Sequence, residues 1–170
     1  MKNLMSAQVD GIPTSFSNLK REQSNIYETL KRMLMGIGTR MARRGGMQKI
    51  FRQMFAAREE EKLLKVSPCY LSTTAGPIAG FLFISTEKVA FCSKRSLRFT
   101  SPSGELIRTP YKVIIPLKKI KRSTESENVH EPTQKYLEIF TVDSFDFWFM
   151  GFVDYQKTFK YVQHVESNPK

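Results

Sequence analysis

The amino-acid sequence predicts an α+β domain in which helices come first, about seven short antiparallel strands follow, and one helix closes the chain. Apolar residues recur at helical spacing in the first third and again near the C-terminus. Between these parts they alternate or run together over strand-length segments that polar turns separate. With 170 residues, 41% of them hydrophobic, and 13 phenylalanines, the chain can fill one compact core and carry an extension.

Residues 1–45 are predicted to form a basic extension that is partly helical. Apolar residues between positions 26 and 41 fall on one helical stripe, although Gly36 and Gly38 each weaken a helix by about 1 kcal/mol relative to alanine. The stripe packs either on the protein's own domain, which the usual burial of such stripes favours, or on an anionic membrane. The candidate residues for this membrane or partner contact are Leu30, Met33, Leu34, Ile37, Arg40, Met41, Arg43 and Arg44.

The sequence RRGG at positions 43–46 is expected to end this segment, and a second helix is expected over residues 47–62. Its apolar residues share one helical face: Met47, Ile50, Phe51, Met54 and Phe55. The good helix formers of AAREEEK continue it. The globular domain, with this leading helix, is therefore placed at residues 46–167.

Strand patterns place most of the strands at residues 65–71, 78–84, 89–92, 111–117, 136–142 and 145–152. Turns are expected at residues 74–77 and 101–104, and a polar loop at residues 123–134. Pro116 cannot donate to a ladder, so its strand is expected to lie at a sheet edge or to carry a bulge. A final helix is expected to begin after Asp154, a suitable N-cap.

The most apolar strand is FDFWFMGF, at residues 145–152. Because side chains alternate along a strand, Phe147 and Phe149 point to one side, and Trp148 and Met150 to the other. Since both sides are apolar, the strand is expected to be covered on nearly both faces, with the phenylalanines inside and Trp148 against the second helix. The segment is interpreted as scaffold, because membrane-inserting loops rarely have a strand's residue preferences.

The net charge of +11 indicates a surface that attracts nucleic acid, anionic lipid or acidic protein. Two dense basic runs stand out: Lys118, Lys119, Lys121 and Arg122, and Lys94, Arg95 and Arg98. If the fold brings both to one rim, they would bind polyphosphate head groups. The alternative is a solvated basic surface with no dedicated ligand. Nucleic acid ranks below lipid, because no RNP motif, zinc finger or helix-turn-helix spacing is present.

Catalytic chemistry finds little support in the sequence. His130 and His164 have no evident nucleophile beside them, and C-x-x-C and H-E-x-x-H spacings are absent. Cys69 and Cys92 are isolated among apolar neighbours and are expected to be reduced and packed. The start MKNLMSAQVDGIP is not expected to be a signal peptide, and no apolar run reaches the ~20 residues that span a bilayer. We therefore expect no enzyme, no cofactor and no metal.

Four long runs resemble one known family: KLLKVSPCYLSTTAGPIAGFLFISTEKVAFCS, YKVIIPLKKIK, QKYLEIFTVD and FDFWFMGFVDY. They look like the GRAM domain of the plant GEM-like proteins, also described as abscisic-acid-responsive, over roughly residues 47–166. The resemblance implies a pleckstrin-homology-like antiparallel β-barrel or sandwich with a C-terminal capping helix. One departure is that the loop STTAGP carries no basic residue, unlike the first strand-to-strand loop of many lipid-binding relatives of this fold.

The resemblance also implies a function. It implies a non-enzymatic protein that binds anionic lipids, either phosphoinositides or phosphatidic acid, peripherally at intracellular membranes of the cytoplasm during hormone or stress responses. The alternative is an adaptor that binds a regulatory protein in developmental or abscisic-acid signalling without specific lipid binding. A nuclear location is a second expectation beside the cytoplasmic one. The charge pattern favours diffuse attraction to a membrane over a specific inositol-phosphate pocket.

Overall fold

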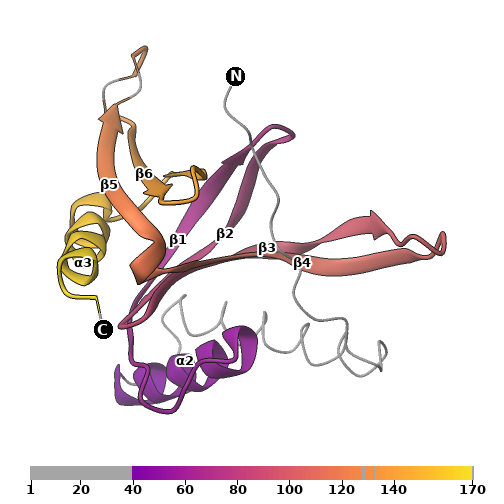
Figure 1. The fold of residues 1–170 in the computed structure, drawn as a ribbon, viewed down its shortest axis with the longest axis horizontal. Helices are drawn as coiled ribbons and strands as arrows, with labels where there is room; N and C mark the ends of the chain where they lie inside the picture. Colours follow the sequence, from indigo (N-terminus) through magenta and orange to yellow (C-terminus); the bar gives the residue numbers. More distant parts are fainter. Residues whose placement is uncertain (1–39, 128, 132, 170) are drawn as a thin grey trace.

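The computed structural model describes residues 40–127, 129–131 and 133–169 (Figure 1). The candidate residues Leu30, Met33, Leu34 and Ile37 lie outside the described residues. Arg40, Met41, Arg43 and Arg44 are described as backbone of the helix α2, Arg40–Phe55. The predicted contact of the N-terminal stripe therefore stays a prediction.

Seven antiparallel strands form one sheet in the order β4-β3-β2-β1-β7-β6-β5. Their bounds are β1 Leu63–Thr73, β2 Gly76–Ser85, β3 Lys88–Thr100, β4 Leu106–Pro116, β5 Ile120–Glu127, β6 Lys135–Thr141 and β7 Asp146–Met150. Strands β4 and β5 are the two edges, and the short 3-10 helix η1, Leu117–Lys119, joins them. The helix α3, Tyr155–Ser167, contacts β5, β1, β2 and η1 on the inner side (Figure 1). The predicted fold class is confirmed, with an open sheet that curls around the core.

The inner face of the sheet holds the main core. Phe149 of β7 is fully buried, with its ring centroid 5.8 Å from that of Phe91 of β3, and Phe147 packs at the margin of the same core. Val113 and Ile115 of β4 are buried in it too, as their alternation predicted. The segment FDFWFMGF therefore forms part of the scaffold, as the sequence indicated.

The outer face of β2 and β3 holds a second core under α2 (Figure 1). Phe51 and Phe55 of α2 pack on Phe83 of β2, with ring centroids 5.9 and 5.2 Å apart. The predicted contact between this helix and Trp148 is wrong. Trp148 instead packs against Tyr136 of β6, with ring centroids 6.2 Å apart. The helix packs on β2 and β3 because their outer faces carry the apolar side chains Phe81, Phe83, Ala90 and Cys92.

Both predicted boundaries of the second helix need correction. The RRGG sequence lies inside α2, because glycine lowers helix propensity without removing backbone donors, and packing of Ile50 and Phe51 favours the helix. The helix ends at Phe55, not at residue 62. Ala56 takes a left-handed φ of 46°, and the Ala57 N–H donates to the Arg52 carbonyl (3.3 Å), which is a Schellman-type end.

The predicted polar loop at residues 123–134 is also wrong in its first part, which belongs to β5. Its polar side chains have partners that a sequence pattern does not reveal. The Thr124 hydroxyl donates to the Glu138 carboxylate of β6 (3.0 Å), and the Ser123 N–H and hydroxyl donate to Glu166 of α3. The edge position of the Pro116 strand is confirmed, as is the Asp154 N-cap, which accepts from the Lys157 N–H (3.2 Å).

Candidate basic binding surfaces

The two predicted basic runs lie toward opposite ends of the β3–β4 pair, so the structure does not bring them to one rim. Lys88 of β3 pairs with Pro116, next to η1, whereas Arg98 of β3 pairs with Arg108. Along β4, which has no bulge here, eight residues separate the two pairs, or about 26 Å at the usual rise. We call Lys118, Lys119, Lys121 and Arg122 the corner cluster, and Lys94, Arg95, Arg98 and Arg108 the hairpin cluster.

The corner cluster occupies η1 and the first residues of β5, and all four of its side chains are exposed. The register of β5 against β6 shifts between Ile120 and Arg122, so two successive residues oppose Phe140. The Lys121 ammonium and the Arg122 guanidinium lie 5.7 and 4.8 Å from the centroid of that ring. This bulge holds two adjacent cations on one side of the strand, where a regular strand would separate them.

The turn between β6 and β7 lies against the corner cluster. The Val142 N–H donates to the Lys119 carbonyl (2.9 Å), and Lys119 Nζ is 3.8 Å from Asp143 Oδ2. The Thr141 hydroxyl, with a smaller effect of Lys119, holds the pKa of Asp143 below its usual range, so this carboxylate is ionised and offsets one cation. The Val142 side chain is 60% exposed. The surface thus combines one exposed apolar side chain with three cations that have no ion-pair partner among the described residues.

The hairpin cluster is shaped by a bulge in β3. The register against β4 shifts between Cys92 and Ser96. Within it, the Ser93 hydroxyl donates to the Arg95 carbonyl (2.7 Å) and accepts from the Tyr111 N–H (2.8 Å). The two residues at the bulge, Lys94 and Arg95, carry exposed side chains.

Arg108 does not stand out in the sequence, because it is not part of a basic run in its stretch of β4. Only the register shows that it lies directly opposite Arg98. The predicted turn at residues 101–104 gives only a partial signal, because counting outward from it pairs position 98 with position 107, one residue short of Arg108. Without structure, that count depends on the unknown register of the turn.

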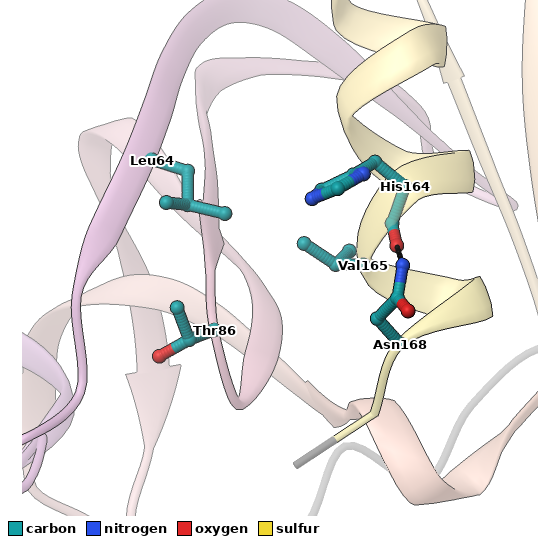
Figure 2. Close-up of a pocket in the computed structure, with 5 residues that line it drawn as sticks. All are labelled: Leu64, Thr86, His164, Val165 and Asn168. Atoms are coloured by element: carbon teal, nitrogen blue, oxygen red, sulfur yellow. Dashed lines mark hydrogen bonds between the residues drawn. The ribbon is translucent and has the colours of Figure 1, made fainter.

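The remaining candidates do not form a reactive site. A small hollow between α3 and the neighbouring strands is lined by Leu64, Thr86, His164, Val165 and Asn168 (Figure 2). The Asn168 amide donates to the His164 carbonyl (3.1 Å), one turn apart on the helix. None of the five lining residues supplies a carboxylate or thiol beside the imidazole, so the hollow lacks an acid–base pair.

The two cysteines are buried on opposite faces of the sheet, Cys69 in the main core and Cys92 in the core under α2. Burial raises the pKa of the Cys69 thiol, which makes it a poor nucleophile. The described residues contain no cluster of histidine, cysteine or carboxylate that could hold a metal ion. Within the same part of the chain, every helix is too short or too polar to cross a membrane.

Comparison with known proteins agrees with this architecture. A family model described as the GRAM domain matches residues 49–169. The chain is therefore a GRAM-domain protein with a pleckstrin-homology-like fold.

Its relatives define the family more closely. GEM-like protein 4 of Arabidopsis thaliana is 55% identical over 156 residues, which cover 89% of this chain and 70% of that protein. GEM-like protein 6 of the same plant is 51% identical over 158 residues, or 91% and 72% of the two chains. The chain belongs to the GEM-like family. A crystal structure of the C-terminal domain of an unknown protein from Leishmania infantum aligns with a TM-score of 0.55 at 18% identity, over 72% of this chain and 99% of that one, which supports the fold alone.

Proposed function

We propose that this protein is a non-enzymatic GRAM-domain protein that binds anionic lipids peripherally at the cytoplasmic face of intracellular membranes. The lipid class is a phosphoinositide or phosphatidic acid, and the process is a plant hormone or stress response. The observation that carries the proposal is the corner cluster, in which Lys118, Lys121 and Arg122 are exposed within five residues beside the exposed Val142.

The energetics support reversible binding. A basic residue near an anionic leaflet contributes about 1 kcal/mol, so three uncompensated cations contribute about 3 kcal/mol. The turn between β1 and β2 adds none, because the Thr73 hydroxyl closes it on the Gly76 carbonyl (2.6 Å) and its residues are uncharged. The binding surface is accordingly a charged patch at the corner, not an inositol-phosphate pocket between the first two strands.

Vesicle flotation tests the proposal. The full chain is mixed at physiological salt with vesicles of neutral phosphatidylcholine, and with the same vesicles containing phosphatidylinositol 4-phosphate or phosphatidic acid. We expect recovery with the anionic vesicles alone, and release when ionic strength rises, because salt screens surface charge. Equal recovery with neutral and anionic vesicles, or none with either, would overturn the proposal.

A second candidate function is an adaptor for a regulatory protein. The observation that favours it is the edge strand β4, where Ile114 is 50% exposed. Edge strands offer backbone groups for pairing with another chain. If it holds, a partner recovered with the wild-type chain is lost with Ile114→Asp and kept with Lys118→Gln/Lys121→Gln/Arg122→Gln. Binding that survives Ile114→Asp would count against it.

A further inference from the structure

The outer part of the β3–β4 hairpin extends away from the rest of the sheet, on the side of the molecule opposite α3 (Figure 1). Beyond the bulge, residues 96–100 pair with residues 106–110 in one continuous register. Five paired residues make a ribbon about 16 Å long. A two-stranded ribbon of this length contributes little to the core, because neither its strands nor its turn at residues 101–104 extends the buried clusters.

Arg98 and Arg108 face each other across this ribbon. Directly opposite residues of antiparallel strands have Cβ atoms about 5 Å apart, and like charges there are destabilising. Both side chains are exposed, and within the described part of the chain neither guanidinium takes part in a hydrogen bond or ion pair. Among the described residues, the two guanidinium groups therefore lie side by side without a carboxylate partner, which is an arrangement that a phosphate dianion would neutralise.

The same face of the ribbon carries an apolar residue nearer the tip. Leu106 is 59% exposed and pairs with Thr100, two positions beyond the arginine pair on each strand. Because strand side chains alternate, Leu106 and Thr100 point to the same side as Arg108 and Arg98. From tip to base, this face thus presents first an apolar side chain and then two cations.

This order matches the depth profile of a membrane surface, where phosphates lie above the acyl boundary. We infer that the β3–β4 hairpin is a second membrane-contacting element, in which Leu106 enters the acyl boundary while Arg98 and Arg108 bind lipid phosphate together. The inference rests on the proposed membrane function and adds a contact site that lies apart from the corner cluster. Its occupant is an anionic bilayer, because a soluble anion would satisfy the arginines but leave Leu106 in water.

Depth is measured with an environment-sensitive dye. The natural cysteines are buried, so an introduced surface cysteine is the reactive one, and the dye is attached in the Leu106→Cys variant. The matched control carries the dye in the Gln163→Cys variant, on the exposed side of α3. With phosphatidic-acid vesicles we expect a blue shift and stronger emission from the dye at position 106 and unchanged emission at position 163.

Affinity is measured with the double variant Arg98→Gln/Arg108→Gln. Each basic residue near an anionic leaflet raises the partition constant about fivefold, so loss of both arginines is expected to weaken binding to the same vesicles about 30-fold. The charge-matched control, Lys157→Gln/Lys160→Gln on α3, is expected to change binding less than about fivefold. Circular dichroism confirms that both variants fold.

These experiments distinguish a failure of the hairpin inference from a failure of the proposed membrane function. If the wild-type chain floats with anionic vesicles while the dye at position 106 stays aqueous, or while both double variants bind alike, the hairpin inference is overturned and the membrane function stands. If the wild-type chain does not float at all, the membrane function fails and the hairpin inference falls with it.

Discussion

Glu61 is the residue whose loss should destabilise the fold most clearly, because it is charged and only 1% exposed. Its Oε1 accepts from the Ser85 hydroxyl (2.5 Å), and its Oε2 lies 3.3 Å from the ammonium of Lys88. The backbone carbonyl of Glu61 accepts from the Gln48 side chain (3.0 Å). These contacts tie α2 and the loop after it to the turn between β2 and β3, and so hold the leading helix on the sheet.

The change to make is Glu61→Ala. Removing one partner of a buried ion pair costs about 3–5 kcal/mol, because the other charge is left without compensation. The Lys88 side chain is 15% exposed, rests 5.8 Å over the Phe51 ring and lies 3.4 Å from the Phe55 carbonyl, so part of its charge stays solvated or paired. We therefore expect the lower end, about 3 kcal/mol.

Urea unfolding of the full chain measures this cost, with Trp148, the one tryptophan in the sequence, as the fluorescent probe. Asp143→Ala is the matched control, because it breaks the exposed pair with Lys119 (3.8 Å) and should cost less than about 1 kcal/mol. A double-mutant cycle with Lys88→Ala isolates the coupling between the two side chains. A loss below about 1 kcal/mol for Glu61→Ala would refute the reasoning that this ion pair fixes α2 to the sheet.

Four further outcomes follow from the packing. Gly80→Ala should destabilise the fold by about 1–3 kcal/mol or more, because a Cβ there would lie 2.3 Å from the Cys92 carbonyl oxygen. Gly45→Ala, in open space inside α2, should instead stabilise the fold by about 1 kcal/mol. Thermal unfolding measures both effects, and equal shifts in the two variants would contradict the geometry. Cys69 should not react with a thiol reagent at pH 8 until denaturant is added, because burial raises its pKa; rapid native labelling would disagree. Arg108→Gln should raise the free energy of unfolding by up to about 1 kcal/mol, because it relieves repulsion from Arg98. A clear loss of stability would contradict this repulsion. Lowering the pH through the depressed pKa of Asp143 should remove its pairing with Lys119, and with it the offset of one cation. Vesicle binding per anionic lipid should therefore strengthen as Asp143 becomes protonated, and weaker binding of the wild-type chain than of Asp143→Asn at that pH would agree only if Asp143 were still ionised.

The sequence predicted the fold well where side chains alternate against a core. In β4, Val113 and Ile115 are buried as their spacing required, and in β7 the same holds for Phe149. β5 could not be predicted in this way, because its inner position Ser123 is satisfied by Glu166 of a distant helix. A strand stabilised by such long-range polar contacts has no apolar period to detect.

The candidate site was predicted in part. The basic residues of both clusters except Arg108 were identified from their density along the chain. Their arrangement was not, because it depends on the length of β3, on the bulge that exposes Lys94, and on a register that places Arg108 opposite Arg98. Spacing along one chain carries no information about which strand lies beside another.

The proposed function requires that the corner cluster, and not net charge alone, binds anionic membranes. The most direct test compares vesicle binding of two triple variants of equal charge: Lys118→Gln/Lys121→Gln/Arg122→Gln and Lys62→Gln/Lys157→Gln/Lys160→Gln, all exposed lysines or arginines. At about fivefold for each contacting residue, the corner variant should bind phosphatidic-acid vesicles on the order of 100-fold more weakly than the wild-type chain, and the control variant within about fivefold of it. Equal losses for the two variants would contradict the account, since binding would then follow total charge and not this surface.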